Sequence, residues 1–226
     1  MNVWAKHRRC KAFICVFAGL LACLTGLLSA AASAEPVRIL ALGDSLTAGY
    51  GLPEPDAFTT RLEAALRAEG LDVTVINAGV SGDTSAGGRA RLGWALSDKP
   101  HAIILELGAN DGLRGLDPAE TERNLDAILT QARAAGLAVL LTGMKAPPNL
   151  GREYGAEFDA IYPRLVEKHD VLFDPFFLEG VAARPELNQP DGIHPNAAGV
   201  EVIVGRMLPL VRELVGKLAG PAKKPL

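Results

Sequence analysis

The stretch Val37-Arg-Ile-Leu-Ala-Leu42 is a short apolar run that ends at Gly43. A run that is apolar almost throughout, rather than alternating with polar residues, is typical of a strand buried on both faces. Ala102-Ile-Ile-Leu-Glu-Leu107 has the same pattern and also ends at a glycine. The two runs therefore predict buried strands of a sheet that is covered on both sides.

Outward from these runs, strand-like and helix-like segments alternate along the chain. Three further strands are predicted at 73–76, 137–142 and 171–173. Helical spacing of apolar residues and boundary signals such as Asp-Pro and Gly predict helices at 58–69, 84–96, 117–136, 154–168 and 195–218. Five such strands predict a three-layer α/β/α domain with an open, parallel, doubly wound sheet rather than an eight-stranded barrel. Ligands bind beyond the carboxyl ends of such strands, so residues that follow strands are the functional candidates.

Residues 1–34 differ from the rest of the chain and have the pattern of a secretory signal peptide. A basic cluster that ends at Lys11 is followed by the apolar run 12–28 and by small residues up to Ala34. We expect cleavage after Ala34 and export across the inner membrane to the periplasm, leaving 35–226 as a single domain without a stable membrane anchor. The alternatives are a retained anchor, because about 17 apolar residues approach the length of a membrane span, and lipidation at Cys23.

Cleavage would change the composition that bears on function. Residues 35–226 keep 19 of the 23 basic and all 26 acidic residues, a formal charge of −7. All three cysteines, at positions 10, 15 and 23, lie in the removed segment, which excludes disulfides and cysteine chemistry from the domain. An acidic domain argues against a nucleic-acid partner. No histidine or acidic spacing of metal-binding type occurs, so we expect neither a metal nor an organic cofactor.

Position relative to the strands singles out one histidine. His101 and His169 each directly precede a predicted strand, which places them at the edge of the sheet opposite the ligand edge. His194 lies in Asp191-Gly-Ile-His-Pro-Asn196, after the last strand and at the start of the final helix. Asp191 can accept the Nδ1 proton at this spacing and leave Nε2 free as a base. The alternative is a helix-start histidine without a chemical role.

Three more candidates follow the first three strands. Ser45, in Gly43-Asp-Ser45, can become a nucleophile if a base takes its proton. Gly82 exposes a backbone N–H and Asn110 adds a side-chain amide, and both donors can stabilise the oxyanion that forms in ester hydrolysis. Each motif alone is equally compatible with an ordinary turn. The chain has no G-x-S-x-G elbow, which disfavours the α/β-hydrolase family.

Taken together, four blocks resemble the SGNH, or GDSL-type, hydrolases. They are Gly43-Asp-Ser-Leu46, Asn77-Ala-Gly-Val-Ser-Gly82, Gly108-Ala-Asn-Asp111 and Asp191-Gly-Ile-His194. Their order and spacing span nearly all of 35–226, and their longer strings are similar to the bacterial periplasmic thioesterase I, lysophospholipase and arylesterase subgroup. The resemblance implies a flavodoxin-like sheet of strand order 2-1-3-4-5. It also implies a nucleophile at Ser45, oxyanion donors at Ser45, Gly82 and Asn110, and a base at His194 oriented by Asp191.

The implied function is that of a serine esterase acting on carboxylic esters and thioesters through an acyl-enzyme, of arylesterase, lysophospholipase or acyl-CoA thioesterase type. The substrate-binding candidates are Asp44, Leu113, Leu116, Ala146 and Leu150. Phe176 and Phe177 are further candidates for an acyl groove. A carbohydrate O-acetylesterase with the same triad and a non-enzymatic binding module remain as alternatives. The sequence predicts no particular oligomeric state.

Overall fold

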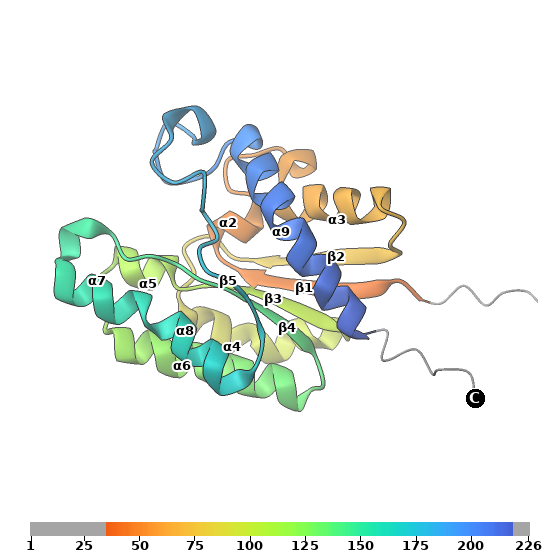
Figure 1. Ribbon diagram of the computed structural model, residues 1–226, viewed down its shortest axis with the longest axis horizontal. Helices are drawn as coiled ribbons and strands as arrows, with labels where there is room; N and C mark the ends of the chain where they lie inside the picture. The colour runs from red at the N-terminus through yellow and green to blue at the C-terminus, as the bar shows by residue number, and fades with distance from the viewer. Residues whose placement is uncertain (1–34, 219–226) are drawn as a thin grey trace, which may run out of the picture. The chain divides into compact units, whose positions relative to one another are not determined.

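The computed structural model describes residues 35–218 and contains one five-stranded sheet (Figure 1). All strand pairs are parallel, and the spatial order is β2-β1-β3-β4-β5. The strands are β1 (Val37–Gly43), β2 (Val73–Gly79), β3 (Ala102–Glu106), β4 (Ala138–Thr142) and β5 (Leu172–Asp174). The predicted α/β class, parallel sheet and strand order are therefore confirmed. The predicted signal peptide, 1–34, lies outside the described residues.

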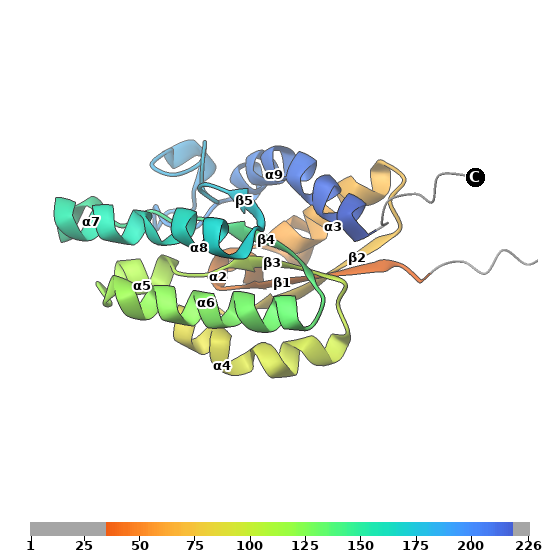
Figure 2. The ribbon, with the colours of Figure 1, turned by 60° about the horizontal axis from the view of Figure 1, so that its bottom comes forward.

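Helices cover both faces of the sheet and give it three layers (Figures 1 and 2). On one face α3 (Phe58–Ala68) packs beside α9 (Ala197–Leu218). On the other face lie α4 (Ser85–Ala95), α6 (Pro118–Ala134) and α8 (Ile161–His169). All five residues of β3 are buried, because an interior strand between two helical layers has no exposed face.

Short helices and turns occupy the loops between these elements. The short helices are α2 (Ser45–Ala48), α5 (Ala109–Leu113) and α7 (Arg152–Asp159). Single 3₁₀ turns span Glu54–Asp56, Leu96–Asp98, Pro148–Leu150 and Pro185–Leu187. Because α2 and α5 directly follow β1 and β3, both lie at the carboxyl edge of the sheet. No helix within residues 35–218 combines the length and the apolar character that a bilayer crossing requires.

One predicted helix, 154–168, is two helices in the structure. α7 ends at Asp159 and α8 begins at Ile161, with Ala160 between them. Pro163 explains the break, because proline has no N–H to donate to the carbonyl four residues earlier and its ring crowds that carbonyl. A second difference concerns β2, which continues to Gly79, three residues beyond the predicted end at Ile76.

Candidate active site

The candidate nucleophile Ser45 lies where β1 turns into α2. Asp44 caps this short helix, since its side chain accepts the N–H of Leu46 at 3.0 Å. Ser45 is the first residue of the helix, at the carboxyl end of an interior strand. Gly43 is required before it, because a Cβ there would collide with the side chains of Thr47 and Glu106.

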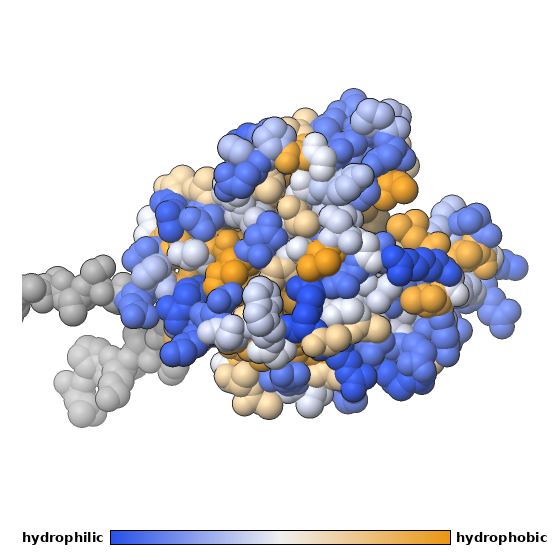
Figure 3. Space-filling model, turned by 180° about the vertical axis from the view of Figure 1, so that it is seen from behind, coloured by the Kyte–Doolittle hydropathy of each residue, from blue (hydrophilic) through white to orange (hydrophobic). Residues whose placement is uncertain are grey.

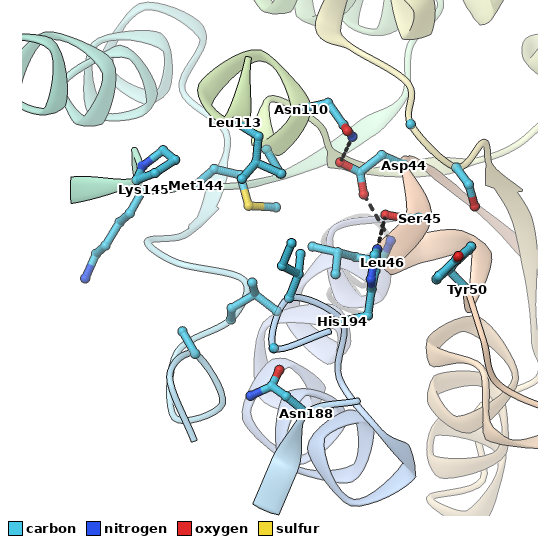
Figure 4. A pocket seen from close by; sticks show the side chains of 18 of the residues that line it. Asp44, Ser45, Leu46, Tyr50, Asn110, Leu113, Met144, Lys145, Asn188 and His194 are labelled. Carbon is cyan, nitrogen blue, oxygen red and sulfur yellow. Dashed lines mark hydrogen bonds between the residues drawn. The ribbon is translucent and has the colours of Figure 1, made fainter. Parts of the chain in front are cut away.

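Ser45, His194 and Asp191 form one continuous chain of hydrogen bonds. His194 Nε2 lies 2.9 Å from Ser45 Oγ (Figure 4). His194 Nδ1 lies 2.7 Å from Asp191 Oδ2. The Asp191–Gly192 turn holds this geometry, since Asp191 Oδ1 accepts the backbone N–H groups of Ile193 and His194 at 2.9 and 3.0 Å. In the sequence, His194 is three positions after Asp191 and 149 positions after Ser45, and the fold brings the three side chains together.

The hydrogen bonds to Asp191 fix its charge. The backbone N–H and ring of His194, together with the N–H of Ile193, lower the pKa of Asp191 to about 2. An ionised Asp191 accepts a hydrogen bond from the protonated Nδ1 of His194. This tautomer leaves the lone pair of Nε2 directed at Ser45. Tyr50 flanks the imidazole, with its ring centroid 4.6 Å from that of His194.

Three residues with hydrogen-bond donors line the cavity beside Ser45 Oγ: Ser45 itself, Gly82 and Asn110. The backbone N–H groups of Ser45 and Gly82 have no hydrogen-bond partner among the described residues. Asn110, on α5, donates one Nδ2 hydrogen to Asp44 Oδ2 at 3.0 Å, which leaves its second hydrogen free (Figure 4). Unpaired donors of this kind can hold a developing oxyanion.

Two arginines that sequence reasoning missed hold the Gly82 loop. Arg91, on α4, donates to the carbonyls of Gly43 and Ala78 at 2.8 and 2.7 Å and to Asp83 Oδ2 at 2.6 Å. Arg114 donates to the carbonyl of Gly82 at 2.8 Å. Neither contact has a local sequence signal, because each joins residues that are at least eight positions apart through tertiary packing.

Asp44 has a different environment from the one expected of a substrate-binding residue. Its side chain borders the cavity but is only 1% exposed, and its oxygens are occupied by Leu46 and Asn110. Burial raises the pKa of Asp44 to about 6, an effect that those two hydrogen bonds partly offset. The geometry therefore makes Asp44 the group that orients Asn110.

A cavity of about 330 Å³ opens beside Ser45 and has a largely apolar wall. Its apolar lining includes Leu46, Leu113, Met144, Phe176, Leu178 and Ile193. Among these, Leu113 and Ile193 are about half exposed, so the entrance is apolar as well as the wall. On the face that Figure 3 shows, apolar residues lie on both sides of a hollow in the surface, and others are scattered among hydrophilic residues.

Three predicted substrate-binding residues do not line this cavity: Leu116, Ala146 and Leu150. Leu150 lies over Gly115, and the backbone N–H of Ala146 is turned towards Asp159, to which it donates at 3.0 Å. The carbonyl of Leu116 accepts the hydroxyl of Tyr154 at 2.8 Å, which turns this segment towards α7.

The two aromatic candidates, Phe176 and Phe177, lie in different environments. Phe176 lines the cavity, whereas Phe177 is buried against Phe58 with its ring centroid 5.1 Å away. The structure instead adds Met144, Leu178 and Ile193 to the wall, from loops whose packing has no periodic pattern in the sequence.

The other two histidines of the described residues lie away from this edge. His101 Nδ1 accepts the N–H of Arg38 at 3.0 Å beside the amino end of β3, and His169 Nε2 lies 2.7 Å from Asp126 beside the amino end of β5. Within residues 35–218, no cluster of three or more histidine, cysteine or acidic side chains could hold a metal ion.

A parallel sheet of this strand order, with Ser-Asp-His and an Asn-Gly pair at its carboxyl edge, defines the class of SGNH hydrolases. The chain belongs to the GDSL-like lipase/acylhydrolase family, whose model matches residues 41–202. It is an enzyme of this hydrolase family.

Individual relatives are similar over most of their length. Esterase TesA of Pseudomonas aeruginosa is 41% identical over 178 residues, 78% of this chain and 89% of the relative. Thioesterase 1/protease 1/lysophospholipase L1 of Escherichia coli K12 is 42% identical over 178 residues, 78% of this chain and 84% of the relative. The crystal structure of AlinE4, described as an SGNH-hydrolase family esterase, is 50% identical with a TM-score of 0.68, covering 84% of this chain and 99% of that one.

Proposed function

We propose that the chain is a serine esterase that cleaves acyl esters and thioesters through an acyl-enzyme on Ser45. The observation that carries this proposal is the hydrogen-bonded chain from Asp191 through His194 to Ser45, beside an apolar cavity. A binding module has no need of a serine whose hydroxyl is hydrogen-bonded to an imidazole that a carboxylate orients.

The chemistry follows from the positions of these groups. His194 Nε2 takes the proton of Ser45 Oγ, which attacks the carbonyl carbon of the substrate. The N–H groups of Ser45 and Gly82 and the free Nδ2 hydrogen of Asn110 hold the oxyanion. His194 then gives its proton to the leaving alcohol or thiol. In the second half of the cycle His194 activates water, which releases the acid and restores Ser45.

The cavity wall supports acyl or aryl groups of appreciable size as substrates. A largely apolar cavity with a few convergent polar groups at one end favours a ligand with an apolar body and one polar reacting group. Medium-to-long acyl esters, aryl esters, lysophospholipids and acyl thioesters meet this description. The names of the relatives, which include esterase, thioesterase and lysophospholipase, support the same substrate class.

A panel of p-nitrophenyl esters from acetyl to dodecanoyl, together with an acyl thioester, tests this function. We expect hydrolysis by the wild type with a preference for chains longer than acetyl, and loss of activity in Ser45→Ala. Full activity of Ser45→Ala would refute the serine mechanism. Activity on acetyl esters alone would favour the carbohydrate O-acetylesterase, and no hydrolysis of any member would favour a binding module.

We also infer that residues 1–34 direct export to the periplasm and are then removed. The basic, apolar and small-residue order of this segment supports the inference. N-terminal sequencing of protein recovered from the periplasmic fraction of a Gram-negative host tests it. A mature chain that begins at Glu35 is expected, and full-length protein retained in the membrane, or a lipidated Cys23, would contradict it.

A further inference from the structure

Glu106 is a buried acid for which the hydrolytic steps have no use. It ends β3 opposite Gly43 of β1, and its side chain is 0% exposed. A Cβ on Gly43 would lie 2.5 Å from Glu106 Oε2, so the carboxyl lies directly against the backbone that leads to the nucleophile. Fully buried carboxyls are rare because burial removes their hydration, so this one needs a physical reason.

The contacts of Glu106 are with the residues on either side of Ser45. Oε2 accepts the backbone N–H of Asp44 at 3.3 Å and the hydroxyl of Thr47 at 2.7 Å. One oxygen therefore joins the start of the nucleophile turn to the third residue of α2. The other oxygen, Oε1, is buried and has no hydrogen-bond partner among the described residues.

Asp44 extends this contact to the oxyanion donors. While its N–H is held by Glu106, its carboxylate holds Asn110 at 3.0 Å. The two strand ends β1 and β3 are thus linked twice, once through the interior by Glu106 and once at the cavity by Asp44 and Asn110. A shift of Glu106 would move Ser45 and Asn110 relative to each other.

The surroundings of Glu106 favour its neutral form. No lysine, arginine or histidine within residues 35–218 forms an ion pair with it, and the adjacent buried acid is Asp44. Burial, reinforced by the charge of Asp44, raises the pKa of Glu106 well above its ordinary range. Tyr162, on α8, is the other titratable group close by, and it is buried and uncharged. An unpartnered buried oxygen such as Oε1 is also far less costly on a neutral carboxyl than on a carboxylate.

We propose that Glu106 is a positioning residue that, as a neutral carboxyl, fixes the nucleophile turn and, through Asp44, the amide of Asn110. The inference rests on the proposed function and deepens it. It assigns to the end of β3 a role in transition-state geometry that does not involve contact with the substrate.

Two variants of Glu106 separate shape from charge. Glu106→Gln keeps an acceptor oxygen in the same place and mimics the neutral acid, so we expect kcat within about threefold of wild type and a superimposable pH profile. Glu106→Ala frees the Asp44 N–H and the Thr47 hydroxyl in the interior. We expect its kcat to fall between about tenfold and a hundredfold with KM unchanged, because Glu106 does not line the cavity and a misplaced oxyanion donor acts on the transition state.

A matched pair of threonines controls for a general loss of stability. Thr47→Val removes the hydroxyl that Glu106 holds, whereas Thr142→Val removes an equally buried hydroxyl that donates to the carbonyl of Leu105 and does not line the cavity. We expect both to lower Tm and only Thr47→Val to lower kcat. This pair also tests the proposal if Glu106→Ala does not fold.

The possible outcomes distinguish a positioning role of Glu106 from a purely structural one. A kcat within threefold of wild type in Glu106→Ala, or equal kcat effects of the two threonine variants, would overturn the positioning role. A loss in Glu106→Gln as large as in Glu106→Ala would show that a charge is needed and would overturn the neutral form. Ser45→Ala in the same assay keeps the two proposals apart. If it hydrolyses the ester as the wild type does, the proposed function fails, whereas an inactive Ser45→Ala leaves only the role of Glu106 in question.

Discussion

Replacing Asp44 by asparagine exchanges one carboxylate oxygen for an NH₂ group, and the hydrogen bonds around Asp44 make this exchange important. Both of its oxygens accept, one from the N–H of Leu46 and one from Asn110 Nδ2. An asparagine at this position presents an oxygen to one donor and an NH₂ group to the other. If its oxygen keeps the helix cap, its NH₂ group opposes that of Asn110.

We therefore expect Asp44→Asn to invert the amide of Asn110, so that its oxygen instead of its N–H faces the substrate. Loss of one oxyanion donor typically lowers kcat by about a hundredfold or more, and we expect a loss of this order with KM little changed. Steady-state kinetics on one preferred ester measures it. Wild-type kcat in the variant would show that Asp44 does not orient Asn110.

The same substitution has a predicted pH signature in stability. The folded pKa of Asp44, about 6, is above its ordinary 3.8, so folding favours the protonated acid. The stability that this provides is complete below pH 4 and is lost as pH rises through 6. Because asparagine does not titrate, the stability of Asp44→Asn relative to wild type should increase by up to about 3 kcal/mol between pH 4 and 7. Urea unfolding at several pH values measures the change, and a pH-independent difference would contradict the buried acid.

The pH dependence of activity belongs to the base and to Asp44. His194 must be neutral to accept the proton of Ser45. Asp44 must be ionised for its carboxylate to accept the hydrogen bond from Asn110 as an anion. Asp191, with its pKa at about 2, stays charged through the working range and adds nothing to the decline. We expect kcat/KM to fall reversibly as pH decreases from 8 to 5. An optimum below pH 5 would be incompatible with His194 as the base.

At the scale of elements, the loop after β2 is as important as the triad. Gly82 has φ +81°, a conformation that glycine adopts without strain, and its peptide N–H is one of the proposed oxyanion donors. Space does not limit this position, since a Cβ would meet only Arg114, at 3.8 Å. Backbone strain alone therefore determines the effect of a substitution.

Gly82→Ala should lower stability by about 1 kcal/mol and lower kcat by tenfold or more, because the loop relieves the strain by moving its N–H. Gly136→Ala is the matched control. Gly136 has φ +78° and nothing within 4 Å of a Cβ, and it lies at the opposite edge of the sheet, before β4. Equal kcat in the two variants, measured beside their Tm values, would remove Gly82 from the oxyanion site.

The contrast between predicted and missed features also lies at this scale. Strands and the residues that follow them could be predicted, because apolar runs ending at glycine mark buried strands and a parallel sheet brings their ends together. Ser45, Gly82, Asn110 and His194 follow from this rule. The cavity wall could not be predicted in this way, because the packing of the long loops determines whether Leu113 or Leu150 faces the substrate. Pro163, in the first turn of α8, is a local sequence signal for the break between α7 and α8.

For the whole molecule, stability comes from one apolar core without covalent links. All three cysteines lie within the first 34 residues, so residues 35–226 contain none. We expect the Tm of a chain that begins at Glu35 to be the same with and without a reductant such as dithiothreitol. A Tm that falls on reduction would contradict this expectation, and full-length protein measured in parallel shows whether the first segment contributes.

For the molecule as a whole, we propose that four loops at one edge of the sheet together make Ser45 a nucleophile. Mass spectrometry of peptides after treatment with a fluorophosphonate tests it most directly, because the reagent reacts with an activated serine and is not limited by the acyl specificity of the cavity. We expect one stoichiometric adduct on Ser45 that is lost when His194 is replaced by alanine. An unmodified Ser45, or a principal adduct on another serine such as Ser81, would contradict it.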